Sequence, residues 1–108
     1  MRCPPELTEL LKTLYNLSPA ESEVFASVCG EEWTVEELSE ALERDRSTVQ
    51  RYLSSLQAAG LISRRTGSTS ERGRSYVYFV SDKDELKDRI KQRLDDWEHE
   101  KVEKLEEL

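Results

Sequence analysis

The sequence of 108 residues is poor in the residues on which several classes of protein depend. It has only 1 histidine and 2 cysteines, too few for a multi-histidine metal site or a disulfide scaffold. No apolar run approaches the ~18 residues that cross a membrane, and the N-terminus lacks the apolar stretch of a signal peptide. We therefore predict a cytoplasmic protein with no membrane partner, no metal and no other cofactor.

Motifs of enzymes are also lacking. The one histidine, His99, lies between Glu98 and Glu100 in a strongly charged segment, which is typical of a solvated surface residue rather than a general base. Gly67 and Gly73 are flanked by predicted strands and not by the strand-to-helix turn of a phosphate-binding loop. We predict that the protein is not an enzyme.

Charge is abundant and unevenly distributed. Charged residues make up 36% of the chain, with only 4 Gly and 3 Pro, a composition typical of amphipathic helices. The net charge of -7 divides into -8 over residues 1–43, +5 over 44–80 and -4 over 81–108. All 7 basic residues of the middle segment are arginines. An acidic chain with one arginine-rich segment predicts a surface that attracts a polyanion.

Three helices are predicted in the first part of the chain. Leucines at helical spacing indicate a helix over residues 4–17. Ser18 and Thr34 each begin a capping box, with a glutamate three residues later, so a helix is expected to start after each of them. The helix after Ser18 is expected to end at Gly30 in a left-handed conformation. Trp33 is expected to pack onto the core.

The period of the pattern changes after residue 60. A fourth helix is predicted over residues 47–59, with Gly60 at its end. Residues 61–65 and 76–80 are predicted to be strands, joined by a Gly/Ser/Arg loop over 67–75. Together they predict a β-hairpin with a long tip.

The last segment, residues 81–108, is predicted to form one helix that starts at a cap around Asp82. Some 26 helical residues span roughly 39 Å, which is longer than a core of this size can cover. Such a helix needs a partner, either the chain's own N-terminal helix or a second copy, or both. The predicted dimerisation residues are Leu86, Ile90, Leu94, Trp97 and Leu105.

The order of these elements is that of a winged helix-turn-helix. We predict a mainly α fold with a small β-hairpin (α+β), with an N-terminal helix over 1–17, the DNA-binding domain over 18–80 and a dimerisation helix over 81–108. The helix over 47–59 is expected to enter the major groove, where Gln50 can pair with adenine and Arg51 with guanine or a phosphate. The predicted DNA-binding residues are Arg44, Arg46, Ser47, Thr48, Gln50, Arg51, Ser54, Arg64, Arg65, Ser68, Thr69, Arg72 and Arg74.

The two ends of this surface are expected to act differently. Ser47 and Thr48 can donate to phosphate at the positive end of their helix, and Arg72 and Arg74 at the hairpin tip suit the backbone or a narrow minor groove. Gln50 and Arg51 are therefore predicted to read bases, and Arg72 and Arg74 are predicted to hold the backbone.

Residues 17–80 resemble the winged-helix domain of the archaeal TrmB-like regulators, a group close to the MarR and ArsR families. The likeness is carried by LSPAESEVFASV, by WTVEELSEALERDRSTVQRYLSSLQAAGLI and by SYVYFV at the end of the hairpin. The helices before and after this stretch match short, single-domain members. The resemblance implies a homodimer that controls transcription. Larger members continue into a sugar-binding domain, and the resemblance does not extend to sugar sensing.

Other functions remain open on the sequence. The strongest alternative is a winged helix that contacts other proteins in an assembly and does not bind DNA, although such domains usually lose the basic residues on these elements. RNA binding by the same surface is a further alternative. An effector or a regulatory protein as an additional partner also stays open. Cys29 is expected to be a small buried hydrophobe, and Cys3, in an exposed terminus, leaves open a thiol switch with a partner's thiol.

Overall fold

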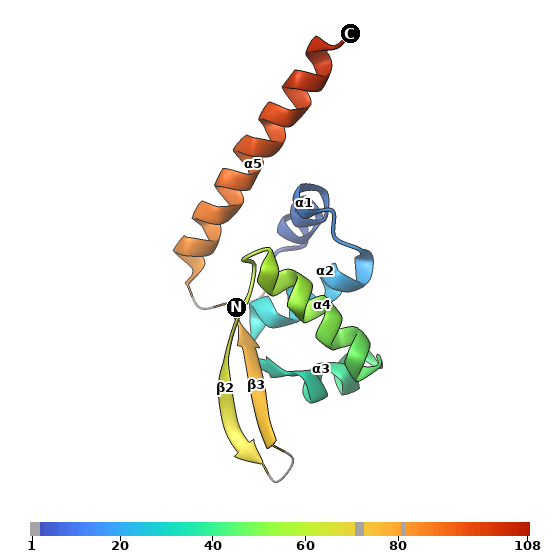
Figure 1. Cartoon of the computed structure of the whole chain (residues 1–108), viewed down its shortest axis with the longest axis vertical. Coiled ribbons are helices and arrows are strands. Elements are labelled where there is room, and N and C mark those ends of the chain that lie inside the picture. Colours follow the sequence, from blue (N-terminus) through green and yellow to red (C-terminus); the bar gives the residue numbers. More distant parts are fainter. Residues whose placement is uncertain (1–2, 71–72, 81) are drawn as a thin grey trace.

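The protein is elongated because its last helix projects beyond the rest of the chain. The computed structural model describes residues 3–70, 73–80 and 82–108, and of residues 68–70, 73 and 74 the backbone alone. Its principal extents are 60 × 27 × 22 Å, and Figure 1 shows the last helix and the hairpin pointing in opposite directions. The elements in chain order are α1 (Pro5–Tyr15), α2 (Pro19–Gly30), β1 (Trp33–Thr34), α3 (Val35–Leu42), α4 (Arg46–Ala58), β2 (Ser63–Ser70), β3 (Gly73–Phe79) and α5 (Lys83–Glu106).

Both predicted capping boxes are confirmed. The Ser18 hydroxyl accepts from the backbone N–H of Glu21 at 3.1 Å, and the Glu21 carboxylate accepts from the Ser18 N–H at 3.1 Å. Thr34 and Glu37 make the same pair of bonds at 3.2 and 2.8 Å. Each box satisfies two backbone N–H groups that a helix start leaves free, so these two boxes determine where α2 and α3 begin.

The predicted left-handed end at Gly30 is wrong. Gly30 is the last residue of α2, and the next residue, Glu31, is extended, with φ -160°. The Ser27 carbonyl accepts from the Glu31 N–H and from the Trp33 indole N–H at 2.9 Å, so the end of α2 is capped without a left-handed residue. Left-handed helix ends occur instead at Asn16, at Glu43 and at Gly60 (φ 78°), the residue predicted to end the fourth helix.

The hairpin is longer than predicted, and a third strand joins it. β1 pairs with β3 and β3 with β2, all antiparallel, in the order β1-β3-β2. The predicted loop over 67–75 is wrong, because the ladder continues to Thr69–Arg74 and Ser70–Gly73 after an irregularity between Thr66 and Thr69. Gly67 lies at this bulge, where a Cβ would come within 3.1 Å of the Val77 side chain. A glycine here lets the strands continue past the bulge.

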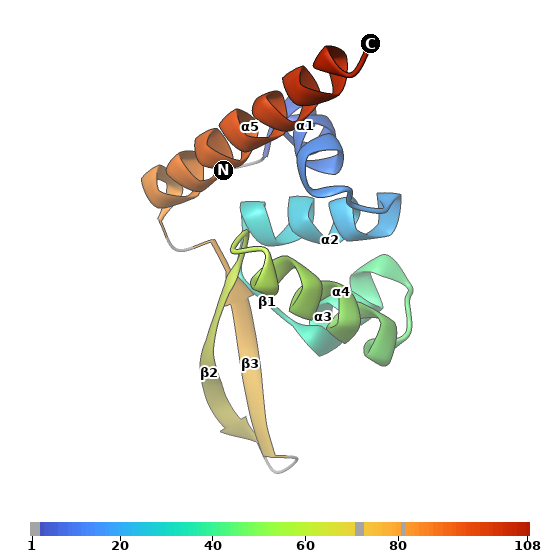
Figure 2. The ribbon, with the colours of Figure 1, turned by 45° about the horizontal axis from the view of Figure 1, so that its top comes forward.

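The core joins the helices to the sheet. Phe25 of α2, Leu38 of α3, Leu53 of α4 and Tyr78 of β3 are fully buried in one cluster. Figure 2 shows α5 crossing over α1, above the layer formed by α2 and α4. A mainly helical winged fold with a long C-terminal helix is therefore confirmed, with β1 as an addition. No helix in the described part of the chain is long and apolar enough to span a membrane.

Candidate nucleic-acid interface

The helix α4 presents one apolar face to the core and one polar face to solvent. Val49, Leu53 and Leu56 are fully buried, while Arg51 and Ser54 are exposed. This is the arrangement expected from the helical spacing of the apolar residues. The tight turn before α4 is closed by Glu43 in the left-handed conformation (φ 52°) at the end of α3. We call the exposed side of α4 from Arg46 to Ala58 the recognition face.

The N-terminus of α4 is capped by a carboxylate. Asp45 accepts from the backbone N–H groups of Ser47 at 3.1 Å and Thr48 at 3.3 Å, and the Ser47 hydroxyl also donates to it. These bonds, the Ser47 hydroxyl first, hold the pKa of Asp45 below its usual value, so the carboxylate is charged at neutral pH. The helix starts at Arg46 and not at Ser47. The predicted phosphate site at this end is therefore already occupied by an internal anion.

Gln50 connects the recognition helix to the sheet. Its side-chain amide donates to the Tyr78 hydroxyl at 3.0 Å and to the Ser54 hydroxyl at 3.3 Å. Tyr78 is fully buried, so the contact fixes α4 against β3. Bidentate pairing of Gln50 with adenine requires its amide to leave Tyr78. Sequence analysis missed Tyr78, whose position 28 residues away in the chain gives no local signal.

Three of the predicted DNA-binding arginines are paired with glutamates of this chain. All six side chains are substantially exposed, so each pair is weak and can exchange for a phosphate. The Arg65 hydrogen bond to Glu32 lowers the pKa of that glutamate. The pairs are Arg44–Glu23 at 3.6 Å, Arg46–Glu36 at 3.4 Å and Arg65–Glu32 at 2.6 Å.

Among the arginines whose side chains the structure describes, Arg51 and Arg64 are exposed and not offset by a glutamate in this way. Arg51 lies over the ring of Tyr52 at 5.7 Å, and Arg64 over the ring of Tyr76 at 4.1 Å. Neither forms an ion pair with a carboxylate in the part of the chain that the structure describes. Stacking on a ring leaves the guanidinium N–H groups at its edge available to a phosphate or a base. These two arginines, one on α4 and one on β2, are the strongest candidates for nucleic-acid contacts.

The other wing residues lie along the far half of the hairpin. Ser68 and Thr69 are on β2 and Arg74 on β3, where Arg74 is paired with Thr69 in the ladder. Arg72 lies outside the described residues. Figure 1 shows this part of the hairpin at the end of the molecule opposite the free end of α5.

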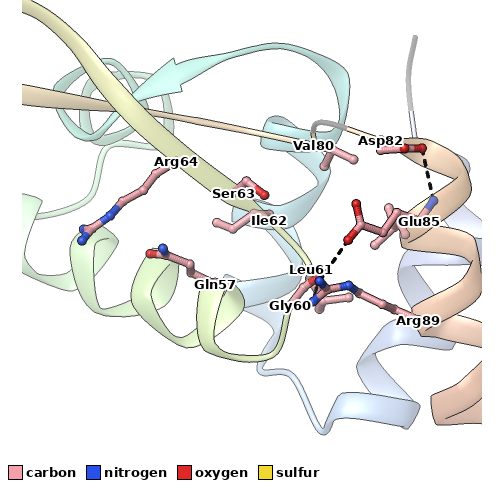
Figure 3. Close-up of a pocket in the computed structure, with 11 residues that line it drawn as sticks. Gln57, Gly60, Leu61, Ile62, Ser63, Arg64, Val80, Asp82, Glu85 and Arg89 are labelled. Atoms are coloured by element: carbon pink, nitrogen blue, oxygen red, sulfur yellow. Dashed lines mark hydrogen bonds and ion pairs between the residues drawn. The ribbon is translucent and has the colours of Figure 1, made fainter.

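A polar pocket of about 340 Å³ lies where α4, the start of the wing and α5 meet. In Figure 3 the Arg89 guanidinium reaches the Gly60 carbonyl, at 3.4 Å, and also pairs with Glu85 at 3.2 Å. Gln57 and Arg64 line the opposite side of the pocket. Arg89 thus connects the end of the recognition helix to α5 across the left-handed turn at Gly60.

The predicted dimerisation residues divide into two groups. Leu86 and Ile90 are each only 8% exposed and belong to the chain's own core, and Trp97 is half-buried against it. Leu94 and Leu105 are 38% and 64% exposed. The chain's own body therefore covers one face of α5 from Leu86 to Trp97, and Leu94 and Leu105 remain as exposed apolar side chains.

The two cysteines lie close together. Both thiols are free and half-buried, so the prediction of Cys3 in an exposed terminus is wrong. Cys3 packs against the hydrophobic core, as Cys29 does. Burial, followed by the hydrogen bond with Cys29, raises the pKa of Cys3 to about 12, so its thiol is protonated at neutral pH and reacts slowly. No three His, Cys, Asp or Glu side chains among the described residues come together as a metal site.

Substituting the capping carboxylate tests how much it opposes a polyanion. Asp45→Asn keeps a good N-cap while it removes one negative charge from the start of α4. We expect tighter binding to duplex DNA at low salt, by about twofold to fivefold, with the gain fading at high salt because the effect is electrostatic. A titration of labelled duplex at two salt concentrations measures it, with Asp95→Asn on α5 as the control. An equal gain in the control would show that only net charge matters.

Comparison with known proteins gives a family and a fold. The family model described as "Sugar-specific transcriptional regulator TrmB" matches residues 11–84. An uncharacterized protein of Methanocaldococcus jannaschii is 36% identical over 92 residues, which are 84% of this chain and 76% of that protein.

Two solved structures share the fold. One is of a protein from Methanosarcina mazei Go1 described as a "possible transcriptional regulator", with a TM-score of 0.77, 24% identity and coverage of 94% of this chain and 87% of that one. The other is MepR of S. aureus in complex with DNA, with a TM-score of 0.56, 17% identity and coverage of 94% and 82%.

Proposed function

The chain belongs to the TrmB family of transcriptional regulators, and from that premise we propose that it is a homodimer that binds specific sites in double-stranded DNA. The observation that carries the proposal is the placement of Arg51 and Arg64. Both lie on the two elements that a winged helix-turn-helix presents to DNA, and neither is neutralised by a carboxylate in the described part of the chain. MepR, which shares the fold, has been solved in complex with DNA, and that complex supports DNA as the partner.

In this proposal α4 enters the major groove with its recognition face toward the bases. Arg51 reads a base edge or holds a phosphate, and Ser47, Thr48 and Ser54 contact the backbone, with the Ser47 hydroxyl exchanging Asp45 for a phosphate. Arg44, Arg46 and Arg65 exchange their glutamate partners for phosphates as the duplex approaches. The remaining wing residues, Ser68, Thr69, Arg72 and Arg74, lie along the backbone or in the minor groove.

Gln50 has a different part in this proposal from the base reader that the sequence suggests. Its amide holds Tyr78 and Ser54, so it positions α4 relative to the wing. The oxygen of the amide remains an acceptor that can face a base. Gln50 can therefore position α4 through its amide N–H groups and accept a hydrogen bond from a base through its amide oxygen.

The homodimer would form along α5 from Leu94 to its end. Leu94, Val102 and Leu105 are exposed on this part of the helix. A second copy of the chain would bury this apolar surface. Two recognition helices held about 34 Å apart would then read successive major grooves of a near-palindromic site. Dimerisation thus supplies both the stability of α5 and the spacing of the half-sites.

A winged helix that binds another protein instead of DNA is the second candidate. The observation in its favour is that Arg44, Arg46 and Arg65 already have partners within the chain. A protein-binding domain does not require unpaired arginines on both α4 and β2, and for this reason we favour DNA.

Selection from a library of random-sequence duplexes, at two salt concentrations, tests the proposal. We expect enrichment of a two-fold symmetric motif, and an affinity that falls with salt by about 0.9 log unit per decade for each phosphate neutralised. Binding without enrichment would contradict sequence-specific recognition and indicate a protein that reads shape. No binding at low salt would contradict the DNA proposal and support the protein-binding alternative.

A further inference from the structure

A second cavity lies away from the proposed DNA-binding surface, and its wall is almost entirely apolar. It lies between the start of α1, the end of α2 and the first half of α5, with a volume of about 410 Å³. This volume is in the range of sites for small molecules, about 300–1,000 Å³. Leu7, Leu86, Ile90 and the thiols of Cys3 and Cys29 line it. We call it the α5 base cavity.

The thiols do not make the wall polar. Cys3 and Cys29 both line the cavity, and burial keeps the Cys3 thiol protonated because its pKa is raised to about 12. A protonated, half-buried thiol behaves as a small hydrophobe with only weak hydrogen-bonding capacity. The wall therefore offers a ligand dispersion contacts and almost no partner for a hydroxyl group.

A row of cations borders the cavity on one side. Lys83, Lys87 and Lys91 line it from α5, and the spacing of four residues places them on one stripe of the helix. All three are exposed. Within the described ranges, Lys87 and Lys91 form no ion pair with a carboxylate. The whole chain has a net charge of -7, so these three lysines are a local row of positive charge beside an apolar cavity.

We propose that the α5 base cavity binds a small amphipathic carboxylate, with its hydrocarbon chain against the apolar wall and its carboxylate at Lys87 and Lys91. A chain of about six to ten carbons suits a cavity of this size. A sugar or another polyol does not fit, because it would give up hydrogen bonds to water and find none on this wall. A bare inorganic anion gains nothing from the wall. The inference does not rest on DNA binding.

The position of the cavity relates it to the rest of the fold. Val80, directly after β3, lines it together with Leu86 and Ile90 of α5. A bound carboxylate would therefore contact both the end of the wing strand and the base of the helix proposed to dimerise. A ligand bound in the α5 base cavity therefore contacts Val80, between the wing strand β3 and the helix α5.

Titration of octanoate into the full chain by isothermal calorimetry tests the proposal. We expect one molecule bound per chain and an affinity lowered at least about tenfold in Lys87→Gln/Lys91→Gln. The matched control, Lys101→Gln/Lys104→Gln on the same helix but outside the cavity, removes the same charge and should bind as the unmodified protein does. The preference for octanoate over the uncharged 1-octanol should disappear only in the Lys87/Lys91 variant.

A second measurement locates the ligand. Octanoate should slow alkylation of Cys3 and Cys29 by a maleimide, and Leu7→Trp, which fills the cavity, should abolish binding while circular dichroism confirms the fold. The proposal is overturned if octanoate does not bind at millimolar concentration, if its binding survives both sets of substitutions, or if alkylation is not slowed. If alkylation slows when the protein concentration is raised and not when octanoate is added, a second copy of the chain covers the cavity. That result would also overturn the proposal.

Discussion

Replacing Leu94 and Leu105 together by glutamate is expected to convert the protein from a dimer to a monomer and to lower its affinity for a two-fold DNA site by about 10²–10⁴-fold. The two leucines lie 11 residues apart on α5, three helical turns, so they share one face of the helix. Both are exposed in the single chain, at 38% and 64%. Glutamates in their place would be unpaired charges in the proposed dimer interface, which is strongly unfavourable.

The reason that the DNA affinity should fall so far is effective concentration. In a dimer the second recognition helix binds as an intramolecular step, and a monomer loses that advantage without losing any contact of its own. Sedimentation at several protein concentrations measures the oligomeric state, and titration of a selected duplex measures the affinity. Binding of a single half-site should be affected far less than binding of the full site.

A matched variant separates the interface from added charge. Gln92→Glu/Lys104→Gln lowers the net charge by two units away from the face of Leu94, Val102 and Leu105, and it should leave the dimer intact. If Leu94→Glu/Leu105→Glu also remains dimeric, the interface lies elsewhere on the chain, and the half-buried Trp97 beside the end of α1 becomes the next candidate.

Arg51→Ala is expected to cost about 1–3 kcal/mol of DNA-binding free energy and to relax the preference at one position of the site. Arg51 is exposed on the recognition face, with its guanidinium 5.7 Å from the centre of the Tyr52 ring, so the substitution removes a charge without exposing core. Arg64→Ala on β2 should instead weaken all sequences about equally and reduce the salt slope by about 0.9. Binding to the selected site and to single-base variants of it, across a salt series, distinguishes the two outcomes.

Arg44→Ala is the matched control for Arg51→Ala. It removes the same charge, but Arg44 is paired with Glu23 at 3.6 Å and has to leave that partner before it contacts DNA. We expect a smaller loss than for Arg51→Ala. Equal losses for Arg44, Arg51 and Arg64, with no change in sequence preference, would contradict the division into base readers and backbone holders and indicate a general electrostatic attraction.

The starts of the helices show why local features could be predicted from the sequence. The boxes that begin at Ser18 and Thr34 involve bonds between residues only three apart, so the residue types are sufficient to predict them. The apolar spacing of α4 and the glycine at residue 60 are equally local. The cap at Asp45 was missed, although it follows the same rule, because the turn before α4 is rich in other polar residues.

The site could be predicted in its elements but not in its contacts. Arginine-rich segments on α4 and the hairpin were visible in the sequence, and the TrmB resemblance is confirmed by the family match over residues 11–84. The partners were not visible. Gln50 meets Tyr78 across 28 residues, and Arg65 meets Glu32 across 33, so no spacing rule relates them.

The sequence by itself determined the order of the elements, the starts of α2 and α3 and the concentration of arginine on the recognition helix and wing. Each of these depends on residues close together in the chain or on composition alone. Tertiary structure decided the length of the hairpin, the addition of β1 beside β3, and which arginines form ion pairs with glutamates. It also brought Cys3, Cys29 and the lysines of α5 around one cavity. These outcomes depend on packing between segments far apart in the chain, where one contact forms only because many others hold the backbone in place.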